Sequence, residues 1–274
     1  MQQALDLLAC LIIKNKSISI KKSVLFQVLI RVGIIMFVLF GFVSKAFASE
    51  SFDQNLILGQ SNEQTSVLWE EVKTPAAVSD PKEIEKAVEF ASNATGVRKD
   101  FLMGMLVVES DLGRNFGKCT YGEVEKGAEQ SHLNGNLSSK AWETFKQRRN
   151  TISGIAGGLG YDYKSLKVSC NPGAAYAGTG GAMGIAQFMP DIWMAYKDRI
   201  AAIVGKENPD PWNAKDGVVA MALLVSDTPG VTGHSMYAER NAAKMYLSGT
   251  TSGKYEWYAN QIFYWAANYR SILG

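Results

Sequence analysis

Apolar residues recur at helical spacing along the chain after residue 80, and no long segment alternates strictly between apolar and polar residues. In the first such segment, Asp80 is a candidate cap, Pro81 lies in the first turn and Glu83 follows three residues after the cap, which together mark a helix start. Its apolar positions are Ile84, Ala87, Val88 and Ala91. Because amphipathic helices must bury their apolar faces against one another, this spacing predicts a mainly α fold.

Further segments carry similar helix signals. They span about residues 98–110, 139–151, 190–204, the segment after the candidate cap Asn213, 235–247 and 255–273. Glycine and proline concentrate between residues 153 and 190, so we expect mostly loop there, with at most a small β element near 160–180. The roughly 195 residues from 80 to 274 can hold one sizeable core and are expected to form one domain.

The N-terminal region has the features of an export signal. Residues 24–43 are almost wholly apolar, with Arg31 as the only charge, and four lysines precede them. An A-x-A pattern of small residues ends at Ala48. We therefore expect residues 1–48 to be a signal peptide that is cleaved after Ala48, which places the protein in the periplasm, the cell envelope or the medium. The alternative is an uncleaved anchor that attaches the protein to a membrane through residues 24–43.

Residues 49–79 are rich in Ser, Gln and Glu without sustained periodicity, so we expect a flexible linker there.

Charge argues against nucleic acid as a partner. The full chain has 28 basic and 26 acidic side chains, but residues 1–48 contain six of the basic ones and one of the acidic ones. The remainder, with 22 basic and 25 acidic side chains, has a net charge of −3 and lacks a basic footprint. We expect a monomer.

Two cysteines, Cys119 and Cys170, lie beyond the expected signal peptide. Export favours a disulfide between them, which would close a loop of about 50 residues and stabilise the fold by roughly 4 kcal/mol on the chain-entropy model. Two free thiols too far apart to pair are the alternative. His132 and His234 show no metal-ligand spacing with these cysteines, so we predict no metal site.

A carboxylate lies on the apolar face of the expected helix over residues 98–110. That face carries Leu102, Met105, Leu106 and Glu109, at positions i, i+3, i+4 and i+7. Burial beside apolar groups and the C-terminal end of the helix dipole should both raise the pKa of Glu109. A carboxyl group that stays protonated near neutral pH suits a general acid. The alternative is a solvated Glu109, or one paired with Arg114.

The pair Glu109-Ser110 is followed about 70 residues later by GGAMGIAQFMP, residues 180–190. This combination resembles the lytic transglycosylases, which cleave bacterial cell-wall glycan on a lysozyme-like helical scaffold. Later elements of that family would correspond to residues 246–249 and 258–262. The resemblance covers roughly residues 82–270, and its most specific part is the segment 181–190. Its glycines let the backbone approach a sugar closely, and Gln187 offers both hydrogen-bond donors and acceptors.

The resemblance implies a role for several residues. Glu109 would be the catalytic acid and base, residues 80–274 the catalytic domain and peptidoglycan glycan strands the partner, without cofactor or metal. The residues expected to bind or orient substrate are Ser110, Met183, Gln187, Tyr246 and Tyr258. Leu247 stands where the family usually has Asn, and Asp191 where Ser is common. Residues 118–178 form a long insertion, which we expect to wall one side of the substrate groove.

Two alternatives to a lytic transglycosylase remain. A muramidase would need a second carboxylate to place water or stabilise the sugar cation, and Asp162, Asp210 or Asp216 could supply it only if the fold brings one to Glu109. A non-catalytic protein that binds or helps to assemble the cell wall would keep the groove without turnover, and Leu247 is the feature that favours it.

Overall fold

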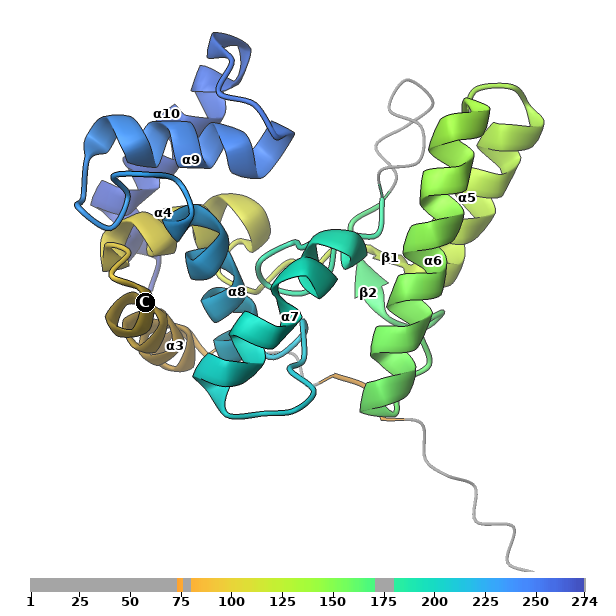
Figure 1. Cartoon of the computed structure of the whole chain (residues 1–274), viewed down its shortest axis with the longest axis horizontal. Helices are drawn as coiled ribbons and strands as arrows, with labels where there is room; N and C mark the ends of the chain where they lie inside the picture. Colours follow the sequence, from red (N-terminus) through yellow and green to blue (C-terminus); the bar gives the residue numbers. More distant parts are fainter. Residues whose placement is uncertain (1–72, 76–79, 171–179, 274) are drawn as a thin grey trace, which may run out of the picture. The chain divides into compact units, whose positions relative to one another are not determined.

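The computed structural model describes residues 73–75, 80–170 and 180–273. The expected signal peptide, the apolar stretch 24–43 and most of the expected linker lie outside the described residues. The helices and strands are α3 (Pro81–Thr95), α4 (Lys99–Ser110), β1 (Cys119–Thr120), α5 (Tyr121–Leu133), α6 (Ser139–Leu159), β2 (Lys167–Val168), α7 (Pro190–Val204), α8 (Ala214–Ser226), α9 (Met236–Ser248) and α10 (Glu256–Asn268), with short 3-10 helices at Gly253–Tyr255 and Tyr269–Ile272 (Figure 1). The prediction of a mainly α fold with a small β element is confirmed.

Several helix starts follow the predicted capping chemistry. The Asp80 side chain accepts a hydrogen bond from the Lys82 backbone at the start of α3, and Asn213 accepts one from the Asp216 backbone at the start of α8. Helix α7 begins at Pro190, as expected. These side chains satisfy backbone N–H groups that have no partner inside the helix.

The region of residues 118–178 differs from the prediction. Helix α5 was not expected, although Thr120 and Glu123 form a capping box at its start. Helix α6 continues to Leu159, through a segment that we expected to be loop. Its glycines are exposed, and for Gly154 a Cβ atom would meet nothing within 4 Å. Packing of the other face of α6 therefore outweighs the cost of its glycines, about 1 kcal/mol each.

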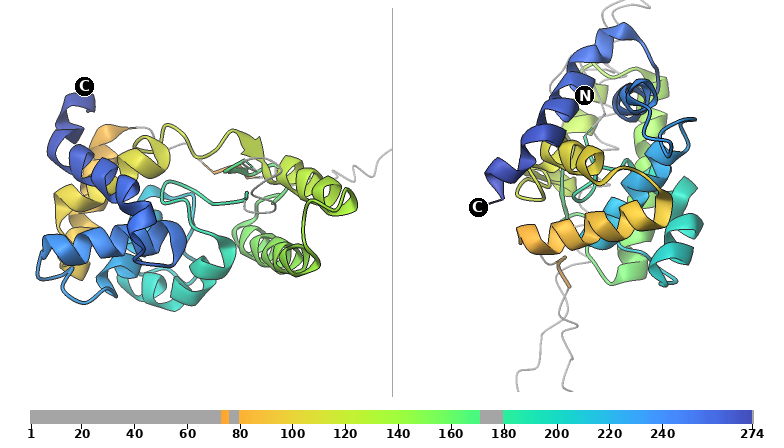
Figure 2. Two further views of the ribbon diagram at one scale, coloured as in Figure 1. Left: turned by 90° about the horizontal axis from the view of Figure 1, so that it is seen from above. Right: turned by 90° about the vertical axis from the view of Figure 1, so that its left-hand side faces the viewer.

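Helix α4 lies at the centre of the core. Its residues 101–107 are all buried, and it packs against α3, α8 and α10 (Figures 1 and 2). At Gly104 the crossing with α10 is so close that a Cβ atom would lie 2.3 Å from the carbonyl oxygen of Ile262 and 2.8 Å from the nitrogen of Ala266. The absence of a side chain at Gly104 thus lets α4 and α10 approach each other along their backbones.

Helices α5 and α6 lie side by side as the α5–α6 hairpin, residues 121–159 (Figure 1). Strands β1 and β2 pair antiparallel at its base, and a disulfide between Cys119 and Cys170 joins the chain on either side of it. The predicted disulfide is confirmed. Aromatic rings of both helices stack within the hairpin, including those of Tyr121, Phe145 and Trp142.

Two observations concern the N-terminal side of the domain. The backbone of Lys73, within the expected linker, forms a parallel bridge with Tyr161, just after α6. Within residues 73–75, 80–170 and 180–273, no helix is both long enough and apolar enough to cross a bilayer.

Candidate active site

Glu109 lies in the last turn of α4, at the edge of a hollow of about 430 Å³ that we call the Glu109 groove. Asp111 and Leu112 then reverse the chain with φ values of 52° and 55°. The side chains that line the groove with Glu109 come from α6, α9, the segment 180–190 and the turn before α10. They are Arg148, Ala182, Gln187, Met189, Tyr246, Leu247, Ser248 and Tyr255.

The surroundings of Glu109 favour its protonated form. Burial raises the pKa of its carboxyl from 4.5 to about 7, and a hydrogen bond donated by the Tyr258 hydroxyl to Oε1 opposes part of that rise. Arg114, which we considered as a partner of Glu109, instead forms an ion pair with Asp111, with Nη2 and Oδ1 2.8 Å apart. A carboxyl with this pKa holds and releases a proton near neutral pH.

The segment 180–190 forms a tight turn beside Glu109. The backbones of Met183 and Phe188 pair with each other, with N–O distances of 2.9 and 3.1 Å. Gly184 has a φ of 63°, and a Cβ atom there would lie 1.8 Å from the carbonyl oxygen of Pro211, so the turn requires glycine. Gln187, with a φ of 51°, donates from Nε2 to the carbonyl oxygens of Gly184 at 2.8 Å and Phe116 at 3.2 Å. These bonds fix the Gln187 side chain at the groove.

Two tyrosines make hydrogen bonds at the site. Tyr246 on α9 donates its hydroxyl to the carbonyl oxygen of Ala186, and its ring meets that of Phe188 edge-on at 5.8 Å. Tyr258 on α10 donates to Glu109. Burial is the main cause that raises the pKa of both phenols well above 10, and the negative charge of Glu109 is the second. Both hydroxyls therefore stay protonated and can donate.

The predicted site residues fall into two groups. Gln187 and Tyr246 line the Glu109 groove. Ser110, Met183 and Tyr258 are 1%, 0% and 2% exposed, so their burial does not fit direct contact with substrate. The Ser110 hydroxyl donates to the carbonyl oxygen of Leu106 and accepts from the backbone N–H of Gly113. These two bonds stabilise the C-terminal end of α4. Met183 anchors the turn, and Tyr258 orients Glu109.

The sequence did not point to Arg148 as a site residue. It lies on α6, within the insertion, and its guanidinium pairs with Asp191 at the start of α7. The expectation that the insertion walls one side of the groove agrees with this position. No motif marks Arg148, because only the packing of α6 against α7 brings it to the groove. Leu247, which is 41% exposed, also faces the groove.

The carboxylates considered as partners of Glu109 are engaged elsewhere. Asp216 is fully buried and binds Lys206 Nζ through both oxygens. Asp210 accepts from the Tyr161 hydroxyl and the Trp212 backbone. Asp162 lies in an exposed turn after α6. Among the described residues that line the Glu109 groove, Glu109 is the only carboxylate.

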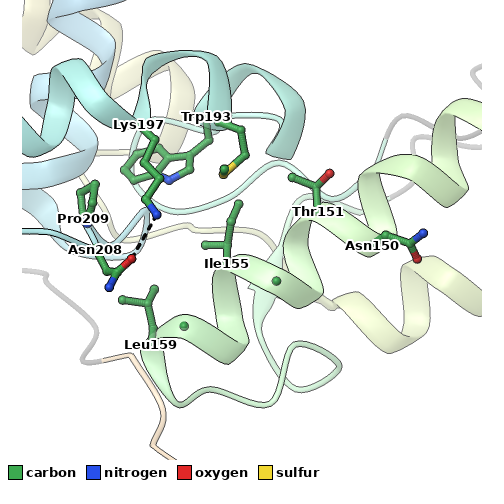
Figure 3. A pocket seen from close by; sticks show the side chains of 11 residues that line it. Asn150, Thr151, Ile155, Leu159, Trp193, Lys197, Asn208 and Pro209 are labelled. Atoms are coloured by element: carbon green, nitrogen blue, oxygen red, sulfur yellow. Dashed lines mark hydrogen bonds between the residues drawn. The ribbon is translucent and has the colours of Figure 1, made fainter.

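A second hollow of about 300 Å³ lies between α6 and α7 (Figure 3). Ile155 and Leu159 on α6 face Trp193 on α7 across it, and a bond of 3.0 Å from Lys197 Nζ to the Asn208 side chain lies at one edge. Its lining is mostly apolar and contains no carboxylate. The Glu109 groove, which does contain a carboxyl group, is therefore the candidate site.

No protein-family model and no curated protein matches the sequence. Among solved structures, the chain is similar to the Escherichia coli lytic transglycosylase Slt35 in complex with bulgecin A, with 23% sequence identity over 59% of this chain and 47% of that chain and a TM-score of 0.41. It is also similar to the soluble lytic transglycosylase SltB1 from Pseudomonas aeruginosa, with 24% identity over 58% of this chain and 51% of that chain and a TM-score of 0.38. The chain thus spans about half the length of the solved structures that it matches.

Proposed function

We propose that this protein is a peptidoglycan lytic transglycosylase that cleaves the MurNAc–GlcNAc β-1,4 bond and leaves 1,6-anhydroMurNAc ends. The observation that carries the proposal is Glu109, a carboxyl group with a pKa of about 7 at the edge of an open groove, held by Tyr258. The resemblance to the family gives further support. It rests on the order along the chain of Glu109-Ser110, the turn 180–190 and the two tyrosines.

Glu109 would act twice. As an acid, it gives its proton to the bridging oxygen, and the bond from C1 of MurNAc to that oxygen breaks. As a carboxylate, it then removes the proton from the C6 hydroxyl of the same MurNAc, whose oxygen bonds to C1. The proton returns to Glu109, and no water is consumed. A pKa of about 7 suits both steps, because the two protonation states are similarly populated near neutral pH.

The other groove residues would hold the sugar. Gln187 uses its amide nitrogen on backbone carbonyls, and its Oε1 has no protein partner among the described residues, so this oxygen can accept from a sugar hydroxyl or acetamido N–H. Leu247 would offer apolar contact where the family usually has an amide.

Export and the domain division belong to the same proposal. Residues 1–48 would direct export as a signal peptide or anchor, residues 49–79 would form a linker, and residues 80–274 would be the catalytic domain. The disulfide is compatible with an oxidising compartment, where the cell wall lies.

The two alternatives predict different products. A muramidase adds water and gives reducing ends, but it needs a second carboxylate, and Glu109 is the only one among the described lining residues. A non-catalytic cell-wall protein binds glycan and gives no product. The raised pKa of Glu109 favours an enzyme over this second alternative.

The test is mass spectrometry of the muropeptides released when the purified protein digests peptidoglycan. We expect products one water lighter than hydrolytic ones, and we expect Glu109→Gln to abolish them. The matched control is Glu129→Gln, which makes the same change at an exposed position on α5 and should release the same products as the wild type. Reducing-end products would indicate a muramidase, and glycan binding without any product would indicate the non-catalytic role.

A further inference from the structure

We infer that Arg148, oriented by Asp191, binds a carboxylate on the muramyl substituent of the glycan and so restricts the substrate to acidic glycans. This inference rests on the proposed function. It assigns a specificity to the groove that the chemistry at Glu109 does not require.

The first observation is the position of Arg148. Among the described residues that line the Glu109 groove, it is the only positively charged side chain, and its side chain is 22% exposed. A guanidinium cannot lose its charge in a protein and presents five N–H donors in a planar fork. A half-buried arginine in a groove therefore keeps its positive charge and its N–H donors at a fixed place.

The second observation is the contact with Asp191. Nε of Arg148 donates to Oδ1 and Nη2 donates to Oδ2, both at 3.0 Å, from α6 to the start of α7. This geometry uses one edge of the fork and fixes its plane. No side chain or carbonyl among the described residues accepts from the remaining N–H donors, so a ligand can accept from them. Asp191 is also stabilised by the N-terminal end of the α7 dipole.

The third observation separates Arg148 from the acid–base step. The causes that set the pKa of Glu109 are its burial and the bond from Tyr258, and the charge of Arg148 is not among them. Arg148 therefore has no resolved part in setting the protonation of Glu109. Its loss should weaken binding and leave the pH dependence of turnover unchanged.

The chemistry of the glycan supplies the matching anion. MurNAc differs from GlcNAc by a lactyl ether, whose carboxylate is free in glycan stripped of peptide. In intact peptidoglycan the lactyl group continues into a stem peptide, which has carboxylates of its own. Both forms offer a planar carboxylate that matches a guanidinium fork.

The experiment measures affinity and turnover with four kinds of tetrasaccharide fragment. Two carry carboxylates, one with stem peptides and one stripped to the free lactyl group, and the other two are the same fragments with every carboxylate converted to a methylamide. Dissociation constants are measured by calorimetry in the Glu109→Gln background, with and without Arg148→Gln. The matched control is Arg199→Gln, which breaks a similar two-bond pair between Arg199 and Asp227 outside the groove.

We expect Arg148→Gln to weaken binding of a carboxylate fragment about tenfold and to leave the methylamide fragments unchanged. The fragment that shows the loss identifies the source of the carboxylate as lactyl group or stem peptide. Asp191→Asn should cause a smaller loss of the same kind, and Arg199→Gln none. In the wild-type background, Arg148→Gln should raise KM for the same fragment without shifting the pH profile of kcat.

Equal losses for carboxylate and methylamide fragments would overturn the inference, because a purely structural role would weaken both. No loss for any fragment would also overturn it. If the wild type forms anhydro products and Arg148→Gln shows either result, only the inference fails. If the wild type forms no product and Glu109→Gln binds none of the four fragments, the proposed function fails with it.

Discussion

Glu109 has two properties that rarely occur together in one carboxyl group. It belongs to the apolar face of a core helix, which raises its pKa to about 7, and it reaches an open groove, which gives a substrate access to it. The Tyr258 hydroxyl donates to one carboxyl oxygen and so stabilises the charged form in part. The pKa is raised chiefly by burial, which has a measurable consequence for stability.

The substitution Glu109→Gln should stabilise the fold above neutral pH. The pKa of Glu109 is about 7 in the folded protein, whereas the ordinary value of 4.5 applies to the unfolded chain. The folded state therefore holds the proton more tightly than the unfolded state. The free energy of unfolding of the wild type should therefore fall as pH rises from about 4.5 to 7, by about 1–3 kcal/mol for this group. The variant lacks this loss.

The check is thermal unfolding of both proteins between pH 4 and pH 8, with free energies compared at one temperature. All other titrating groups are common to both proteins, so the difference between them isolates Glu109. A difference that does not change with pH would contradict the raised pKa.

The crossing of α4 and α10 sets the geometry of the acid at the scale of elements. Glu109 lies five residues after Gly104 on α4, and its partner Tyr258 lies on α10. The distance between the two helices, which Gly104 permits, therefore also sets the distance between the carboxyl and the hydroxyl.

The substitution Gly104→Ala should destabilise the protein by about 1–3 kcal/mol, although alanine favours a helix, because the new methyl group meets the backbone of α10. It should also reduce turnover, since α4 must move away from Tyr258. The control is Gly154→Ala on α6, where nothing lies within 4 Å, and it should stabilise by about 0.5–1 kcal/mol. Urea unfolding and the release of anhydro products measure both effects. Equal behaviour of the two variants would show that the crossing tolerates a methyl group.

Local chemistry at helix ends made most elements predictable. Asp80, Pro190 and Asn213 each start a helix through interactions within a few residues, and these starts were found from the sequence. Helix α6 was cut short in the prediction because its glycines suggested a loop, whereas its buried positions decide the outcome through contacts with α5 and α7. Such contacts join distant parts of the chain, so no local pattern records them.

At the scale of the whole domain, the site joins segments that are far apart in the sequence. The position of Glu109 on an apolar helix face could be read from spacing, and that of Gln187 from a glycine-rich motif. The burial of Ser110, Met183 and Tyr258 could not, because it depends on how helices pack around them. Arg148 was missed for the same reason, since it reaches the groove on the α5–α6 hairpin, whose two ends the disulfide joins.

Replacing both Cys119 and Cys170 by serine should lower the free energy of unfolding by about 2–4 kcal/mol, since the bridge spans 51 residues and its loss frees that loop in the unfolded chain. Urea unfolding of the variant and the wild type measures the loss. A reductant should reproduce it in the wild type and should leave the serine variant unaffected. An unchanged midpoint would mean that β1, β2 and the hairpin contacts hold this region without the bridge.

The position of the disulfide also bears on when the protein becomes complete. Helices α4 and α10, which hold Glu109 and Tyr258, lie outside the loop that the bridge closes, whereas Arg148 lies within it. In the reduced chain the acid would be in place, and one wall of the groove would lack its disulfide. Under the export and the substrate that we propose, oxidation would complete that wall only in the compartment of the glycan, so maturation and access to substrate would coincide.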